Sequence, residues 1–318
     1  MPLKPGTVAP GGTIGIVSPS SPSSYASDLE RLRQWGDDQG FRLKFFPHHN
    51  DRNGYLAGTD RDRAADLTAA FADPDVDAVL TMRGGTGGWR MVPYVDYSVI
   101  RDNPKFFSGY SDTTAIHLAI ETQADVVTFY GASGSSLIGK GHSRYTEQHF
   151  LRALTSGDAL GEVEKDPDDP FTWAIREGVA EGVLRGGCLT LLAQSAGTPY
   201  QPDWTGCIIF FEDIGEQPYR LDAYLTHLKL AGMFDGVAGV VVGEHVQCGS
   251  APYKPAYPYG SFTSEDVFRQ HLEPLGVPVM VGLPCGHGRH LATLPLGVNA
   301  RLDTGDMSLT ILEEATTA

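Results

Sequence analysis

The sequence predicts an α/β protein whose N-terminal half forms a doubly wound, mainly parallel sheet, followed by a second domain. Strand-like and helix-like segments alternate along the first half, which is typical of parallel sheets. The length of 318 residues fits about two domains of ordinary size. A stretch at 156–173 is rich in Asp, Glu, Pro and Gly and has weak apolar periodicity. We therefore expect an N-terminal domain at 1–155, a linker at 156–178 and a C-terminal domain at 179–318.

The elements of the first half follow from their apolar patterns. Residues 25–40 carry apolar side chains at near-helical spacing, and we expect this helix to end at Gly40. Thr59 and Asp60 are candidate caps for a helix at 61–71. The other elements expected here are a helix at 113–121 and strands at 13–18, 41–46, 77–82, 105–109 and 126–130.

The second half alternates in the same way and ends differently. The alternation around 303–306 predicts a final hairpin at 297–312. The elements expected before it are strands at 207–211, 237–243 and 277–283 and helices at 219–231 and 264–272.

Composition and charge narrow the class of protein. With 41% hydrophobic and 20% charged residues, the chain has ordinary globular composition. Lys plus Arg is 24 against 39 for Asp plus Glu, and the net charge of -15 argues against a nucleic-acid or anionic-membrane partner. The four cysteines form no C-x-x-C pair, and the N-terminus has no long apolar run. We expect a cytoplasmic enzyme or binding protein with reduced thiols.

Ser111 is the most informative candidate for chemistry. In open α/β sheets, reactive groups gather past the carboxyl ends of strands. A strand, then Gly109-Tyr110-Ser111, then a helix is the order found in a nucleophile elbow. The helix N-terminus would supply N–H groups and a positive dipole end for an oxyanion. Because Thr113 replaces the second glycine of that motif, a role of Ser111 as a simple N-cap stays open.

A serine nucleophile needs a base, and the base needs an orienting carboxylate. His287 lies between two glycines after a strand-like run, and Glu212 directly follows another such run. The order Ser, Glu, His along the chain also occurs in α/β-hydrolases. Two alternatives stay open: Glu212 as a solvated capping acid, and a metal pair of His287 and His290 with His245 or Glu244, for which no third ligand has recognisable spacing.

The glycine-rich segment at 83–88 follows another strand-like run. It matches neither the P-loop pattern nor the dinucleotide-binding glycine pattern, so a phosphate site is not indicated. Its better use is to bring a backbone N–H beside Ser111 as a second oxyanion donor.

Six short segments occur in one order along nearly the whole chain. They are Leu3-Lys4-Pro5-Gly6 with TIGIVSPSSP, MRGG at 82–85, GYSD at 109–112, GTPY at 197–200, FEDIGEQPYRLD at 211–222 and GHGRHLATLPLG at 286–297. In this order they resemble the LD-carboxypeptidase family of serine peptidases, the muramoyltetrapeptide carboxypeptidases. Single segments of this kind are weak signals, whereas the ordered set is specific.

The resemblance implies that Ser111 is the nucleophile, His287 the general base and acid, and Glu212 the orienting carboxylate. It implies oxyanion donors at the backbone of Gly85 and Asp112. It also implies a C-terminal domain of swivelling β/β/α type that carries the Glu and the His, with the site at the domain interface and often within a homodimer. The family uses no metal or cofactor and acts in the cytoplasm on recycled cell-wall peptides.

The expected activity is removal of the terminal D-Ala at the L,D bond of murein tetrapeptide. A cation should hold the free carboxylate of the substrate, and Arg83 and Arg220 are candidates. The chain departs from the family pattern at Thr86, Cys188 and 131–133. These departures leave open a microcin C-like peptidyl-adenylate amidase, or a self-resistance or biosynthetic acyl-transfer enzyme. A binding protein that kept the fold without the activity is the non-enzymatic alternative.

Overall fold

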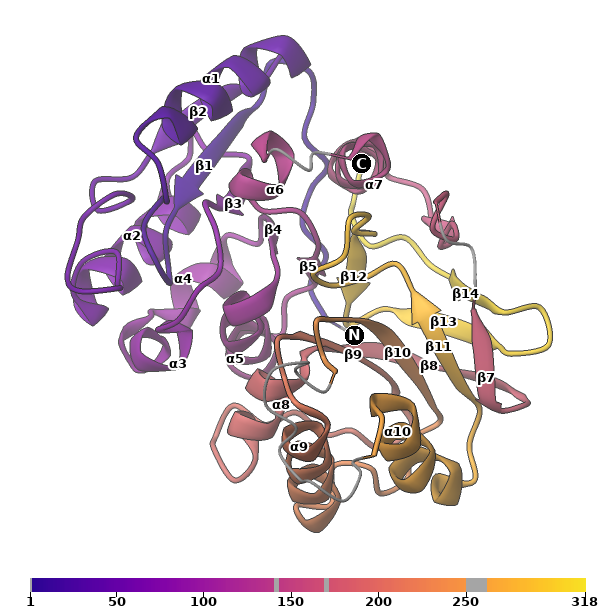
Figure 1. Cartoon of the computed structure of the whole chain (residues 1–318). Helices are drawn as coiled ribbons and strands as arrows, with labels where there is room; N and C mark the ends of the chain where they lie inside the picture. The colour runs from indigo at the N-terminus through magenta and orange to yellow at the C-terminus, as the bar shows by residue number, and fades with distance from the viewer. Residues whose placement is uncertain (1, 140–142, 169–171, 250–261) are drawn as a thin grey trace.

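The computed structural model describes residues 2–139, 143–168, 172–249 and 262–318. In this part of the chain the strands form two sheets, which confirms the two-domain α/β class (Figure 1). The first sheet has the order β12-β5-β4-β3-β1-β2; its strands are parallel except for β12, which is antiparallel to β5. The bounds are β1 Thr13–Val17, β2 Arg42–Phe45, β3 Ala78–Thr81, β4 Phe106–Gly109, β5 Thr128–Tyr130 and β12 Leu294–Leu296.

Helices cover both faces of the first sheet, so the doubly wound arrangement is confirmed. On β1, Ile16 packs in one apolar cluster with Leu32, whereas its neighbour Val17 packs in another with Leu67. The helices of the first face are α1 Ser27–Gln39, α6 Gly134–Ile138 and α7 Arg144–Thr155. Those of the second face are α2 Asp60–Ala72, α3 Gly88–Met91, η1 Val92–Tyr94, α4 Tyr97–Asp102 and α5 Thr114–Ala124, which η2 Ser111–Thr113 precedes.

Local signals set the helix ends that the sequence predicts. Helix α1 ends at Gly40, which takes up the left-handed conformation with φ 78°. Helix α2 begins after Thr59, whose side chain accepts a hydrogen bond from the backbone N–H of Asp62 while the Asp62 side chain accepts one in return. Thr59, and not Asp60, is therefore the cap.

The second sheet has the order β6-β14-β13-β8-β9-β10-β11-β7. Its four central strands, β8 to β11, are parallel, and the flanking strands pair antiparallel. The bounds are β6 Gly161–Glu162, β7 Trp173–Arg176, β8 Val179–Cys188, β9 Ile208–Ile214, β10 Gly239–Val246, β11 Val279–Leu283, β13 Asn299–Asp303 and β14 Ser308–Ile311. Strands β13 and β14 form the hairpin predicted at 297–312.

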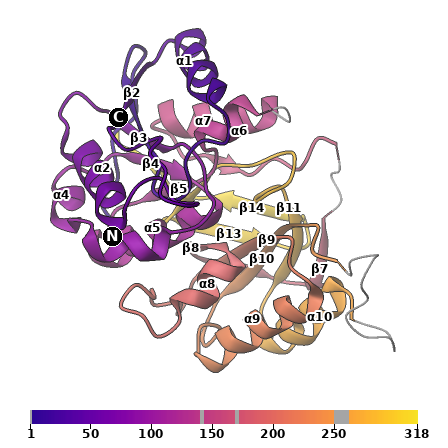
Figure 2. The ribbon, with the colours of Figure 1, turned by 60° about the vertical axis from the view of Figure 1, so that its left-hand side comes forward.

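The two faces of the second sheet have different neighbours. Helices α8 Leu189–Ser195, α9 Pro218–Leu230 and α10 Ser264–Leu272, which η3 Glu273–Leu275 follows, cover one face. Figure 2 shows α9 and α10 on the side away from the first domain. The other face packs on that domain: the rings of Phe210 on β9 and Tyr130 on β5 lie 5.1 Å apart between centroids.

The segment expected as a linker at 156–178 contributes two short strands to the second sheet. Strand β6 pairs with β14 and β7 pairs with β11, at opposite edges of the sheet. Edge strands are short and half-exposed, so they lack the apolar run that marks a central strand. Strand β12 belongs to the second half of the chain but pairs with β5 in the first sheet. Among the described residues, no helix is long and apolar enough to span a membrane.

Candidate active site

Ser111 lies in a strained turn between β4 and α5. Its φ is 63°, in the left-handed region that non-glycine residues rarely adopt. A Cβ atom added to Gly84 would lie 2.9 Å from the Ser111 Cβ, so the glycine loop after β3 packs directly against this side chain. Ser111 is the first residue of the short helix η2, whose N-cap is Tyr110, and the N-cap of α5 is Thr113. In the part of the chain that the structure describes, the simple N-cap alternative therefore does not hold. The geometry is that of a nucleophile elbow.

Glu212 on β9 contacts His287 directly. The Glu212 Oε2 atom lies 2.7 Å from His287 Nδ1 and accepts a hydrogen bond from the His287 backbone N–H at 3.2 Å. Glu212 is 0% exposed, which excludes the solvated capping acid. Because a carboxylate only accepts, this network assigns the ring proton to Nδ1 and leaves Nε2 free as a base.

The environment of His287 favours its charged form. Burial alone lowers the pKa of His287, but the hydrogen bond and negative charge of Glu212, together with Asp213, outweigh burial and raise it. An imidazole that binds a proton more readily than usual suits a general base. The glycine before His287 allows this contact, since a Cβ atom at Gly286 would lie 2.3 Å from Glu212 Oε2.

Tyr130 joins the two halves of this site. Its phenol donates a hydrogen bond to Glu212 Oε1 and accepts one from the backbone N–H of Ser111 at 3.1 Å. Tyr130 was not predicted as a site residue from the sequence. The signal that could have found it is its position as the last residue of β5, beside the end of β4 that precedes Ser111.

Ser111, Glu212 and His287 lie in one cluster, but not every pair of them is in direct contact. Glu212 and His287 touch, and Ser111 reaches Glu212 through the Tyr130 hydroxyl. Tyr110, next to Ser111, lies 5.1 Å from His287 between ring centroids. In the described part of the chain, no hydrogen bond joins Ser111 Oγ to the His287 ring.

Both predicted oxyanion residues lie beside Ser111. Asp112 follows it directly, and its buried carboxylate accepts hydrogen bonds from Ser20 Oγ and from the backbone N–H of Gly88. Burial raises the pKa of Asp112 in spite of these bonds, which hold the residue in place. Gly85 follows the glycine that packs on Ser111, and among the described residues its N–H has no hydrogen-bond partner.

The two arginines expected to bind a carboxylate lie in different places. Arg83 adjoins the glycine loop, donates to Ser24 Oγ and lies close enough to Tyr110 for its charge to act on that phenol. Arg220 lies on the exposed side of α9, bound by Glu216 and Tyr224, and is not brought to the Ser111 cluster.

A cavity of about 160 Å³ adjoins the Ser111 cluster and was not predicted. Tyr110 and the two glycines that flank His287 line it on one side. Arg289 also lines it, with its guanidinium 2.6 Å from Asp168 Oδ2, so a second cation lies beside the site. Hydroxyl groups of Ser136, Ser143 and Thr146 complete the polar lining.

The metal pair considered from the sequence is not assembled. The two ring nitrogens of His290 contact Ser143 Oγ at 2.6 Å and Asp168 Oδ2 at 2.9 Å, whereas His287 Nδ1 contacts Glu212. Within the ranges that the structure describes, the donors close enough to share an ion are those of Asp166, Asp168 and His290.

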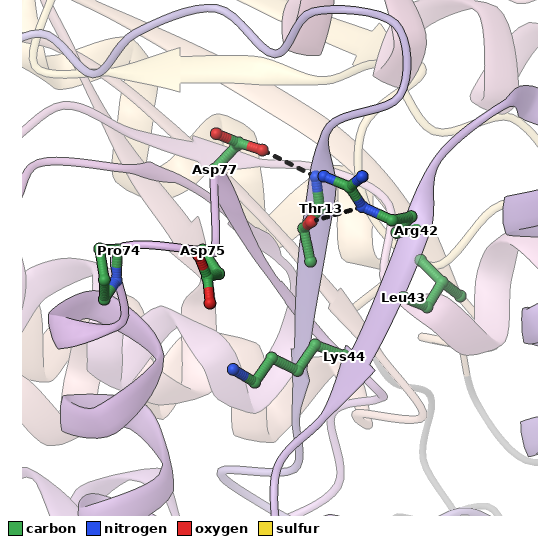
Figure 3. A pocket seen from close by; sticks show the side chains of 7 residues that line it. All are labelled: Thr13, Arg42, Leu43, Lys44, Pro74, Asp75 and Asp77. Atoms are coloured by element: carbon green, nitrogen blue, oxygen red, sulfur yellow. Dashed lines mark hydrogen bonds between the residues drawn. The ribbon is translucent and has the colours of Figure 1, made fainter.

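A second cavity, of about 640 Å³, lies at the end of the first sheet opposite to Ser111 (Figure 3). Thr13, which begins β1, and Asp77, which precedes β3, place it at the amino ends of the strands. Its polar groups bind one another: Asp77 accepts from the Thr13 N–H at 2.7 Å, and Arg42 Nε donates to Thr13 Oγ1 at 3.1 Å. Because parallel sheets bind ligands at the carboxyl ends, the Ser111 cluster is the better candidate site.

Both domains are similar to known proteins. Residues 14–131 match the model of the LD-carboxypeptidase N-terminal domain, and 181–302 match that of the LD-carboxypeptidase C-terminal domain. The Streptomyces coelicolor protein named "Putative carboxypeptidase SCO6489" is 39% identical over 97% of this chain and 96% of its own length. The "Probable murein peptide carboxypeptidase" of Bacillus subtilis is 33% identical over 97% and 94%. A structure of MccF with glutamyl sulfamoyl guanosine superimposes with a TM-score of 0.87 at 25% identity, covering 99% of this chain and 100% of that one.

Proposed function

The chain belongs to the LD-carboxypeptidase family, and from this premise we propose that it is a serine carboxypeptidase that removes the terminal D-Ala of a murein tetrapeptide. The family makes it a peptidase. The observation that carries the finer proposal is the buried Glu212–His287 pair beside the strained Ser111 turn. A serine, a histidine and a carboxylate in this arrangement perform acyl transfer in unrelated folds.

In the proposed reaction, Ser111 Oγ attacks the carbonyl carbon of the L,D bond while His287 Nε2 takes its proton. The N–H groups of Gly85 and Asp112 bind the oxyanion of the tetrahedral intermediate. His287 then gives the proton to the departing D-Ala amine, and the acyl group stays on Ser111. Water, deprotonated by His287, releases the shortened peptide and restores the serine. Ser111 Oγ and His287 Nε2 have to approach each other when substrate binds, because catalytic hydrogen bonds that are long in a free enzyme often tighten only in its complex with substrate.

The free carboxylate of the substrate requires a cation near Ser111. Arg83 at the glycine loop and Arg289 at the adjoining cavity are the candidates for this role. Arg220 was an equal candidate in the sequence, but it lies on the exposed side of α9 and does not line this cavity. We therefore assign the carboxylate to Arg83 or Arg289.

The direct test is release of free D-Ala from murein tetrapeptide by the purified protein. We expect wild type to release it and Ser111→Ala to lose about a thousandfold or more in turnover. A fluorophosphonate should also label Ser111. A labelled protein that releases no D-Ala would contradict the substrate, and near-normal turnover by Ser111→Ala would contradict the nucleophile. An unlabelled, inactive wild type would favour the non-enzymatic binding protein.

A second candidate is an amidase for peptidyl-adenylates or related aminoacyl nucleotides. MccF is a microcin C7 self-immunity protein, and its structure holds an aminoacyl sulfamoyl nucleoside. Cys188, one departure from the family pattern, lies next to the site: its N–H donates to Thr114 Oγ1, which donates to the Ser111 carbonyl. Cleavage of a peptidyl-adenylate analogue in preference to tetrapeptide would favour this candidate.

We also propose that the protein acts in the cytoplasm as a homodimer, as the family resemblance implies. Light scattering of the purified protein should give twice the mass of one chain. A single-chain mass at working concentration would contradict the dimer.

A further inference from the structure

One buried hydroxyl contacts both the nucleophile turn and the carboxylate. Tyr130 lies at the end of β5 in the first sheet, and Glu212 lies on β9 in the second. We propose that Tyr130 is a positioning residue that couples the Ser111 turn of one domain to the Glu212–His287 pair of the other. The proposal rests on the proposed function and adds to it a fourth residue that touches neither substrate nor the transferred proton.

The direction of each hydrogen bond follows from the groups present. A phenol has one proton to donate, and Glu212 Oε1 can only accept it. The Ser111 N–H can only donate, so it donates to a lone pair of the same Tyr130 oxygen. Burial raises the pKa of Tyr130 well above its ordinary value, with the charge of Glu212 acting in the same direction, so the phenol keeps its proton.

This arrangement divides the carboxylate between two partners. Oε1 accepts the hydrogen bond of the Tyr130 hydroxyl, and Oε2 accepts those of the ring and backbone N–H groups of His287. The phenol therefore takes up part of the negative charge that would otherwise act on the imidazole. It also occupies the Ser111 N–H, so the oxyanion donors must come from the next residue and from the glycine loop.

Removal of the Tyr130 hydroxyl should affect both Glu212 and the Ser111 turn, the two groups to which it is hydrogen-bonded. In Tyr130→Phe, His287 is the one donor to the carboxylate that remains among the described residues. We therefore expect the pKa of His287 to rise further, by about half to one unit. The Ser111 turn loses one of its bonds, and we expect kcat to fall about tenfold or more with little change in KM, since the hydroxyl does not touch substrate.

The test is an NMR titration of the His287 ring in the substrate-free protein. The comparison is wild type, Tyr130→Phe and, as matched control, Tyr97→Phe, which removes a half-buried hydroxyl that donates to the Val92 carbonyl far from the site. Other titratable groups near the pair are the same in all three proteins: Tyr110, Cys188, Asp213, His245, Cys248 and Cys285. We expect an upward shift in Tyr130→Phe alone.

An unchanged His287 titration and unchanged kcat in a folded Tyr130→Phe protein would overturn the proposal and leave Tyr130 a packing residue. If Tyr130→Phe fails to fold, 3-fluorotyrosine at position 130 replaces it. Fluorine makes the phenol a stronger donor, so the His287 pKa should then fall. No shift in that protein would also overturn the proposal. Because the titration uses no substrate, a failure of the proposed peptidase activity is seen separately, in the D-Ala assay.

Discussion

At the scale of single residues, the charge of Glu212 dominates the chemistry of the site. It holds the pKa of His287 above the ordinary value of 6.5 against the effect of burial. A base must be neutral in the free enzyme, so kcat/KM should fall on the acidic side at a pH above 6.5. A profile of kcat/KM against pH checks this. If the acidic limb of this profile lay well below pH 6, Glu212 would not raise the pKa of His287, and the prediction would be wrong.

Glu212→Gln removes the charge but keeps the shape. Burial then acts on His287 without opposition, so its pKa should fall below the ordinary value, and the amide no longer selects the Nδ1 proton. We expect kcat to fall by about four orders of magnitude, as for the corresponding Asp→Asn change in a serine protease triad. Combined kinetics and ring titration measure both effects. A variant with the wild-type titration would show that the carboxylate does not set the charge of the base.

Gly84 limits the position of Ser111, the proposed nucleophile. An added methyl group would lie 2.9 Å from the Ser111 Cβ, closer than real contacts allow, and 3.1 Å from its Oγ, which is a tight contact. Gly84→Ala should therefore displace the hydroxyl and lower kcat about a hundredfold, because small displacements of reacting groups cost this much. The control is Gly6→Ala, where a Cβ atom would meet nothing within 4 Å. Equal activity of the two variants would contradict the packing of the loop on Ser111.

At the scale of elements, what the sequence predicts depends on burial. The central strands and capped helices carry strong local patterns, and both predicted ends at Gly40 and Thr59 are found. The edge strands β6 and β7 carry none, since their neighbours and not their own residues decide the pairing. Ser111 and His287 could be predicted as candidates because each follows a strand, and Glu212 because it comes directly after the apolar run of β9. The strand-end position of Tyr130 could mark it as a candidate, but its hydrogen-bond partners could not be predicted, because they depend on how the two sheets pack.

One ion pair joins an element of each domain. Arg185 on β8 binds Glu121 near the end of α5, and burial raises the pKa of Glu121 although the arginine opposes this. Arg185→Met would leave the carboxylate buried without a partner, so we expect a loss of about 3 kcal/mol in the free energy of unfolding. The double variant Glu121→Leu with Arg185→Met should recover most of this loss. Urea unfolding of the wild type, both single variants and the double variant measures the coupling, and additive losses would contradict it.

At the scale of the whole molecule, the two sheets share one apolar core. A single buried cluster contains Ile16 and Phe129 from the first sheet and Phe210, Met280 and Leu302 from the second. Separating the domains would expose this cluster, and each such side chain contributes about 1.5–3 kcal/mol when buried. The Ser111 cluster lies at the same interface, so its geometry depends on the domains staying together.

The shared core predicts that both domains unfold in one cooperative transition. Calorimetry should give one peak, and hydrogen exchange should show the amides of β1 and β10 opening together. Met280→Ala on β11 tests the coupling. The substitution should lower the free energy of unfolding by about 2–5 kcal/mol. If the domains unfold together, the amides of β1 in the other domain should lose protection to the same extent. The control is Leu230→Ala, since Leu230 is 82% exposed and should change little. Two separate peaks, or a Met280→Ala protein whose β1 amides keep their wild-type protection, would show that the domains unfold independently and that the site can open between them.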